Sequence, residues 1–180
     1  MEKITLHDKR FRLCMEAKEI DAAVCRVAEQ LTEDLKNTDT PIFLSVLNGS
    51  FMFAADLMRK ITVQSDVAFI KMASYSGTES TGEVKQIMGL TKSIEGKTVV
   101  VIEDIVETGN TLEEMYRILE AAGAAEIKIC TLLFKPQAYK KDIKIDYAAL
   151  QIPNDFIVGY GLDYNQLGRQ YKDIYVLDGQ

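Results

Sequence analysis

The chain has 180 residues, of which 47% are hydrophobic and 27% are charged, and its formal net charge is -6. This length and composition suit one soluble globular domain with its own core, so we expect a single domain over residues 1–180. The negative charge argues against broad binding of nucleic acid through phosphates, and no apolar run is long enough to span a bilayer.

Cysteine and histidine usage exclude several kinds of site. The three cysteines, Cys14, Cys25 and Cys130, are widely spaced, which favours neither a disulfide framework nor a zinc site. The single histidine, His7, has no serine or cysteine constellation around it, so histidine-based nucleophilic catalysis has no support. The charged N-terminal segment lacks the apolar stretch of a signal peptide, so we expect a cytoplasmic protein with no membrane partner.

The first predicted elements are a helix, a strand and a second helix. Apolar residues recur at intervals of three and four over residues 17–36, which predicts an amphipathic helix. Residues 42–47 predict a core strand, and the turn at 48–50 leads into a helix that ends near residue 60. That turn by itself fits an ordinary tight connection. The residues of the second helix expected to face the core are Phe51, Ala54, Ala55 and Leu57.

A further strand is expected over residues 67–73, followed by a polar stretch over 74–83. This stretch contains two glycines and is too hydrophilic to form core. Its length and polarity fit a lid over a site, although composition alone favours an ordinary exposed hairpin loop. Another strand is expected over residues 84–90.

The stretch from 99 to 112 combines a buried strand with chemically active residues. Val99 to Ile102 are β-branched and apolar, which is typical of a strand of a parallel sheet buried on both faces. Glu103 and Asp104 follow where that strand is expected to end, and ligands of open α/β sheets bind beyond such ends. The turn at 107–111 then offers hydroxyls, a glycine and backbone N–H groups before a helix, which favours phosphate binding. An acidic strand end without that turn would fit a purely structural connection.

The second half continues the alternation of helices and strands. A helix is expected over residues 111–122, with Gly123 as its C-terminal cap, and a buried strand over 127–134. Lys135 follows that strand and should open into the same crevice as Asp104. The alternation predicts an α/β fold with a mainly parallel central sheet flanked by helices.

The last part of the chain changes character. Residues 147–152 predict a strand, residues 156–160 form a short apolar run, and a polar tail containing Arg169 follows. Taken by itself, Phe156 is more often a core aromatic than a residue that stacks on a ligand.

Several motifs together resemble those of the hypoxanthine-guanine branch of the type I phosphoribosyltransferases. E-D-I-V-E-T-G-N-T is similar to the phosphoribosyl-diphosphate motif, and V-L-N-G-S-F is similar to the diphosphate loop, which often has a cis peptide. A-S-Y-S-G resembles the flexible loop, and I-P-N-D-F-I-V-G-Y-G-L-D-Y-N resembles the purine-binding hood. The matching segments are 47–58, 73–83, 99–112, 132–135 and 152–169.

This resemblance implies a fold, a reaction and its partners. The fold would be the type I phosphoribosyltransferase fold, with a small hood formed by about residues 150–170 together with N-terminal residues. The reaction would transfer the phosphoribosyl group from phosphoribosyl diphosphate to a 6-oxopurine, giving IMP or GMP and diphosphate in purine salvage. The resemblance further implies Mg²⁺ as cofactor and a homodimer or homotetramer, while hypoxanthine, guanine and xanthine all stay open as the preferred base.

The resemblance also assigns a role to each matching position. The residues implied to bind phosphoribosyl diphosphate are Glu103, Asp104, Thr108, Gly109, Asn110, Thr111, Asn48, Gly49 and Arg169. The residues implied to bind the purine are Lys135, Phe156, Ile157 and Asp163. The implied lid residues are Ser74 and Tyr75, the implied acid/base is Glu107, and the implied metal ligands are Asp163, Glu103 and Asp104.

Three positions depart from the branch. Asn48 replaces a lysine, Glu107 replaces an aspartate, and Asp155 stands where a basic residue is common. Regulators with the same fold offer a second class of function, because they sense phosphoribosyl diphosphate or bind RNA. They usually lose the lid or hood or add a basic surface, whereas this acidic chain keeps both. A Rossmann nucleotide-binding protein is a third class, which the absence of G-x-G-x-x-G disfavours.

Overall fold

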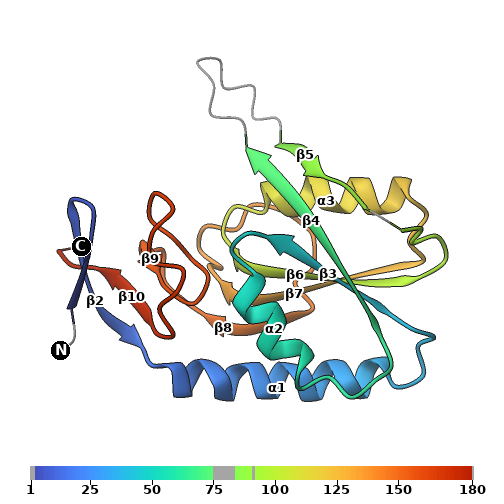
Figure 1. Ribbon diagram of the computed structural model, residues 1–180. Helices are drawn as coiled ribbons and strands as arrows, with labels where there is room; N and C mark the ends of the chain where they lie inside the picture. The colour runs from blue at the N-terminus through green and yellow to red at the C-terminus, as the bar shows by residue number, and fades with distance from the viewer. Residues whose placement is uncertain (1–2, 75–83, 91, 180) are drawn as a thin grey trace.

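The structure is a computed structural model that describes residues 3–74, 84–90 and 92–179. Two sheets and three helices make up this described part of the chain (Figure 1). In chain order the elements are β1 (Lys3–Leu6), β2 (Lys9–Met15), α1 (Ala17–Leu35), β3 (Ile42–Leu47), α2 (Phe51–Met58), β4 (Asp66–Ser74), β5 (Val84–Met88), β6 (Thr98–Val106), α3 (Asn110–Ala121), β7 (Glu126–Phe134), β8 (Tyr147–Gln151), β9 (Ile157–Val158) and β10 (Ile174–Leu177).

The larger sheet has the strand order β5-β4-β3-β6-β7-β8. Neighbouring strands from β4 to β8 pair in parallel, while β5 pairs with β4 in the antiparallel direction. The expected mainly parallel sheet flanked by helices is therefore confirmed. Val99 to Ile102 are 0% exposed because helices α1 and α2 cover one face of the sheet and α3 covers the other (Figure 1).

The two helices on one face differ in how well their buried sides were predicted. The apolar side of α1 is buried as expected, through Ile20, Ala23, Val24, Val27, Ala28, Leu31 and Leu35. In α2 the buried residues are Phe53, Ala54 and Leu57, whereas Phe51 is 41% exposed and Ala55 is also exposed. The prediction was wrong for these two residues because 100° per residue turns them away from the side that Phe53, Ala54 and Leu57 share.

The ends of the strands around β6 leave an opening in the sheet. The pairing between β3 and β6 ends at Ser45 and Ile102, whereas β7 pairs with β6 as far as Val106. Glu103 and Asp104 therefore lie within β6 and not beyond its end, which corrects the sequence-based expectation. Because β3 no longer pairs there, the backbone of β6 has a neighbouring strand on only one side at these two residues.

The small antiparallel sheet forms a hood in which both ends of the chain meet. Its strand order is β1-β2-β10-β9, so β10 lies between a strand from the start of the chain and β9 (Figure 1). We did not predict β1, β2 or β10, and the hood extends to Leu177, beyond the expected limit near residue 170. The signal in β2 was weak, because only Phe11 and Met15 are buried in a strand that also carries charged residues. Among the described residues, no helix is long and apolar enough to cross a membrane.

Candidate active site

Two neighbouring carboxylates lie at the opening beside β6. Glu103 is 5% exposed, and burial raises its pKa well above the usual value, with a smaller contribution from the charge of Asp104. Burial also raises the pKa of Asp104 to about 6, although its carboxylate accepts a hydrogen bond of 2.9 Å from the Ile105 N–H. These two groups thus carry negative charge at a cost, and a cation at this position would reduce that cost.

The loop at residues 47–50 lies directly against Asp104. Its Leu47–Asn48 peptide bond is cis, as is frequent in the loop that it resembles. A Cβ atom added to Gly49 would lie 1.5 Å from Oδ2 of Asp104, so any other residue here would force the Asp104 carboxylate to move. The buried hydroxyl of Ser50 hydrogen-bonds that of Ser45 at 2.7 Å, which holds the loop at the start of α2. The structure therefore brings Asn48 and Gly49 to the acidic pair.

The hood reaches the same loop through Gly161. A Cβ atom added to Gly161 would lie 2.1 Å from the Gly49 carbonyl oxygen. Arg169 donates a hydrogen bond of 2.7 Å from Nη1 to the Gly161 carbonyl and forms an ion pair with Asp163 through Nη2. The positive charge of Arg169 lowers the pKa of Asp104, against the larger effect of burial. Arg169 and Asp163 thus join the site that contains Asp104.

A second tie between the hood and α2 involves residues that the sequence did not single out. The hydroxyl of Tyr160 donates a hydrogen bond of 2.7 Å to Oδ2 of Asp56. Asp56 lies on α2, whose first turn follows the loop at 47–50. Both residues lie in matching segments, 47–58 and 152–169, but nothing in either segment indicates that the two side chains meet.

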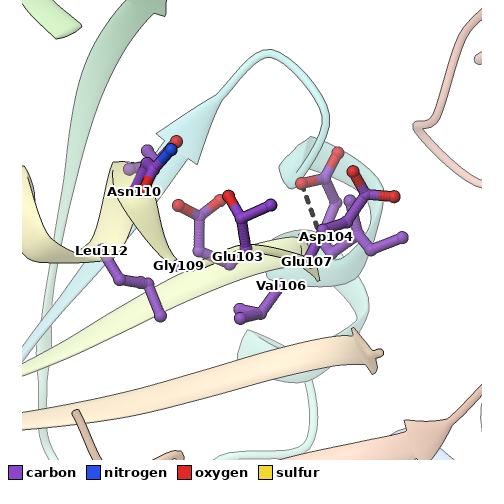
Figure 2. Close-up of a pocket in the computed structure, with 10 residues that line it drawn as sticks. Glu103, Asp104, Val106, Glu107, Gly109, Asn110 and Leu112 are labelled. Carbon is purple, nitrogen blue, oxygen red and sulfur yellow. Dashed lines mark hydrogen bonds between the residues drawn. The ribbon is translucent and has the colours of Figure 1, made fainter. Parts of the chain in front are cut away.

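The turn before α3 forms a pocket with the acidic pair. A cavity of about 280 Å³ is lined by residues 103–112, and Figure 2 shows the acidic side chains and the start of α3 around it. Gly109 has φ +87°, in the left-handed region, and directly precedes α3. The first N–H groups of a helix have no partner within the helix and favour an anion. Val106 and Leu112 also line the pocket and were not predicted, because apolar residues there resemble core.

Lys135 and Glu107 contact each other at the edge of this pocket. Lys135 follows β7, is 4% exposed, and donates a backbone hydrogen bond of 3.0 Å to the Val106 carbonyl. Its ammonium forms an ion pair with Oε1 of the exposed Glu107. A buried ammonium is stable only with such a partner. The structure therefore places the expected purine-reading lysine next to the expected acid/base.

The remaining candidates lie in the hood and at the end of β4. Phe156 is 39% exposed, and Ile157 is buried in β9. The hood segment 152–169 begins near Lys135. This is because β8 pairs with β7, and the Ile152 N–H donates a hydrogen bond of 2.9 Å to the Phe134 carbonyl. Ser74 is the last residue of β4, and Tyr75 lies outside the described residues.

The predicted metal ligands are only partly assembled. Glu103 and Asp104 are adjacent, but Asp163 is paired with Arg169 and also accepts a hydrogen bond of 2.7 Å from the Gln166 N–H. Within the described residues, no group of three or more histidine, cysteine, aspartate or glutamate side chains is arranged to hold a metal ion. The acidic pair provides hard oxygen donors of the kind that Mg²⁺ prefers.

Comparison with known proteins identifies the family. Residues 16–165 match the family model described as the phosphoribosyl transferase domain. The chain belongs to the phosphoribosyltransferase family. It is 40% identical to the hypoxanthine phosphoribosyltransferase of Buchnera aphidicola subsp. Schizaphis graminum over 157 residues, which cover 86% of this chain and 89% of the relative. It is 43% identical to the hypoxanthine-guanine phosphoribosyltransferase of Staphylococcus epidermidis over 152 residues, which cover 83% of this chain and 84% of the relative.

A solved phosphoribosyltransferase structure has the same fold. The hypoxanthine phosphoribosyltransferase of Staphylococcus aureus superposes with a TM-score of 0.86 at 37% identity, and the match covers 93% of each chain. The expected type I phosphoribosyltransferase fold is thereby confirmed, and the Rossmann alternative is excluded.

Proposed function

We propose that this phosphoribosyltransferase transfers the phosphoribosyl group from phosphoribosyl diphosphate to hypoxanthine and guanine, forming IMP or GMP and diphosphate in purine salvage. The observation that carries the proposal is the meeting of three different groups at one pocket. The acidic pair Glu103–Asp104 and the anion-binding start of α3 line it, and the buried ammonium of Lys135 forms an ion pair with Glu107, which also lines it. A ribose diphosphate needs the first two, and a 6-oxopurine needs the third.

The start of α3 suits the 5′-phosphate of the substrate. Backbone N–H groups from Thr108 to Thr111 lie at the start of α3 and would bind the phosphate, and both threonine hydroxyls would add donors. Gly109 and Asn110 complete this loop, where the left-handed φ of Gly109 turns the chain into the helix. We assign the 5′-phosphate to this loop because it is the anion-binding helix start that lines the pocket.

The diphosphate is assigned to the opposite side, near the loop at 47–50. Gly49 lies against Asp104, and Arg169 donates to the carbonyl of Gly161, a residue that packs closely against the Gly49 carbonyl. Asn48 carries no charge where relatives have lysine, so Arg169 provides the cation on this side of the site. The amide of Asn48 can still donate a hydrogen bond to a phosphate oxygen.

We propose Mg²⁺ as the cofactor, since the donors present are carboxylates. Glu103 and Asp104 would hold the ribose hydroxyls and the ion, and their raised pKa values fit a site in which a cation stabilises the charged forms. Asp163 would serve as a further ligand after exchanging its contact with Arg169. When bound, Mg²⁺ neutralises the charge that develops on the leaving diphosphate.

The purine is assigned to the side formed by Lys135 and the hood. The Lys135 ammonium would donate to the 6-oxo oxygen, Phe156 would stack on the ring, and the backbone at Ile157 would contact its neighbouring edge. A backbone carbonyl near Asp163 would accept a hydrogen bond from the 2-amino group of guanine. An ammonium has only donors, so the 6-amino group of adenine would leave both groups unpaired.

Glu107 is assigned as the general acid/base at purine N7. Its ion pair with Lys135 holds the carboxylate at the side where the base would bind. The extra methylene of glutamate relative to aspartate changes where the carboxylate lies, and catalysis is sensitive to shifts of about 1 Å. Ser74 and Tyr75 are assigned to a lid that excludes water from the reacting sugar cation.

The proposal extends to the organisation of the protein. We propose that the central sheet and the hood act as one domain around the site, because the hood contacts the loop at 47–50.

We also propose a homodimer or homotetramer, since Val67 and Phe69 on β4 are 36% and 46% exposed and point to the same side. Sedimentation velocity tests the assembly. The three cysteines are free, which fits the reducing cytoplasm.

The test is turnover with each base. Purified protein is incubated with phosphoribosyl diphosphate and Mg²⁺ and with hypoxanthine, guanine, xanthine or adenine, and nucleotide formation is measured by chromatography. We expect turnover of hypoxanthine and guanine, and kcat/KM for adenine lower by roughly 10⁴-fold. Comparable values for adenine and hypoxanthine would overturn the role of Lys135, and no nucleotide with any base would overturn the proposed reaction.

A further inference from the structure

Phe156 belongs to an aromatic cluster that joins the hood to the start of the chain. Its ring centroid lies 5.8 Å from that of Tyr164, and the two planes meet at 86° in an edge-on arrangement. The ring of Phe11, which is 0% exposed, lies 6.1 Å from Phe156 and 6.2 Å from Tyr164. The proposed stacking ring, itself 39% exposed, thus has two aromatic neighbours that restrict its orientation.

The turn between β1 and β2 holds the side chain of Tyr164 in place. The Tyr164 hydroxyl donates a hydrogen bond of 2.8 Å to Oδ1 of Asp8. This bond is the main reason why the pKa of Asp8 is lowered and that of Tyr164 is raised. The Lys9 ammonium lies 5.2 Å from the Tyr164 centroid and 6.0 Å from the Phe156 centroid, within the range of cation–π attraction. The His7 ring adds an edge contact to Tyr164 at 5.7 Å.

We infer that Tyr164, held by Asp8 and Lys9, is a positioning residue that sets the plane of the Phe156 ring for stacking on the purine. This inference rests on the proposed stacking role of Phe156. A partly exposed phenylalanine that samples several rotamers loses that freedom when a base binds, and the loss weakens binding. A ring already fixed by an edge-on neighbour avoids much of this cost. The N-terminal hairpin then belongs to the purine site although it does not touch the base.

Asp163, the residue before Tyr164, connects this stretch of the chain to the other half of the substrate site. Asp163 pairs with Arg169, on the side assigned to the diphosphate, while Tyr164 contacts the hairpin and Phe156. Two consecutive residues therefore link the two halves of the substrate site through one short stretch of backbone. We expect a change of the Tyr164 ring to affect the purine half selectively, because the Asp163–Arg169 contact does not involve that ring.

The experiment measures the coupling between Tyr164 and Phe156. Tyr164→Leu, Phe156→Leu and the double variant are compared with the unchanged protein by the KM for hypoxanthine, the KM for phosphoribosyl diphosphate, kcat and thermal stability. Because an edge-on aromatic contact contributes a modest free energy, we expect Tyr164→Leu to raise the KM for hypoxanthine about three- to tenfold. The KM for phosphoribosyl diphosphate should change by less than about twofold. In the Phe156→Leu background, Tyr164→Leu should cause no further rise.

Two additional variants separate positioning from general stability. Tyr171→Leu removes another hood tyrosine, whose ring lies 5.4 Å from that of Tyr175, so it should lower stability without changing the KM for hypoxanthine. Tyr164→Phe combined with Lys9→Met retains the ring and removes the Asp8 bond and the cation. This combination should fold even where Tyr164→Leu does not, and it should raise the same KM about two- to fourfold.

The outcomes distinguish the inference from the function on which it rests. If Phe156→Leu leaves the KM for hypoxanthine unchanged, the stacking role of Phe156 is wrong and the inference falls with it. If Phe156→Leu raises that KM but the Tyr164 variants do not, Tyr164 does not position the ring, and the proposed function stands. If Tyr164→Leu raises the KM for hypoxanthine equally in the unchanged protein and in the Phe156→Leu variant, the inference is likewise overturned.

Discussion

Replacing Asp104 by asparagine should stabilise the ligand-free protein at neutral pH. Burial raises the pKa of Asp104 from 3.8 to about 6. A shift of this size corresponds to about 3 kcal/mol of cost for the charged form in the folded state. Asparagine has nearly the same shape, can keep the hydrogen bond from the Ile105 N–H, and does not ionise, so the variant avoids this cost.

The direction in which stability changes with pH depends on whether the folded or the unfolded state binds the Asp104 proton more tightly. The folded protein binds the Asp104 proton more strongly than the unfolded chain, so the folded state loses stability as pH rises from about 4 to about 6. Above pH 6 the loss is complete and constant. The variant lacks this loss, so its advantage should be small near pH 4 and reach about 2–3 kcal/mol above pH 7.

The assay is urea unfolding of both proteins at pH 4.5 and pH 7.5, without metal or substrate. Glu29→Gln on the exposed side of α1 removes the same charge and serves as the control, with an expected change within about 0.5 kcal/mol. Adding Mg²⁺ and phosphoribosyl diphosphate should make the unchanged protein more stable than the Asp104→Asn variant. Ligands stabilise a protein only to the extent that they bind it, and the variant lacks the Asp104 carboxylate. Equal stability of the two proteins at pH 7.5, or the same advantage at both pH values, would refute the argument.

Three further substitutions test the site. Glu107→Gln should lower kcat by about 10²- to 10⁴-fold in steady-state assays, and an unchanged kcat would remove Glu107 from the mechanism. Asp163→Asn should raise the Mg²⁺ concentration needed for half-maximal rate with little change in melting temperature; unfolding with unaltered metal dependence would make the residue structural. Gly49→Ala should raise the KM for phosphoribosyl diphosphate at least tenfold, because its Cβ would lie 1.5 Å from Asp104 Oδ2. A KM equal to that of the unchanged protein would show that the loop shifts freely.

The central sheet was predictable because its sequence signals are local. Val99 to Ile102 are apolar throughout since both faces of β6 are covered, and the apolar spacing in α1 matches the face that it buries. The end of β6 was less predictable, because the length of a strand depends on its neighbours. Glu103 and Asp104 continue the strand since β7 keeps pairing there, and nothing within their own sequence reports that partner.

The hood and the contacts across the site could be predicted only in part. The residues at 103–111 were recognisable by their order, but the Lys135–Glu107 ion pair joins residues 28 positions apart. The β2–β10 pairing joins the first and last parts of the chain; β2 has only two buried residues among charged ones, and β10 is only four residues long. Tyr164 lies within the hood motif, but its role could not be predicted from it, because Asp8, which accepts its hydrogen bond, lies 156 positions away.

The central position of β10 in the hood has a consequence for the order of synthesis. Strands β2 and β9 both pair with β10 and are separated by it, so they remain unjoined until residues 174–177 have left the ribosome. The strands from β3 to β8 are made earlier and can pair while the chain is still growing. A nascent chain that has already formed its phosphate pocket would therefore still lack the sheet behind the purine side, and base binding would begin only when these last strands pair.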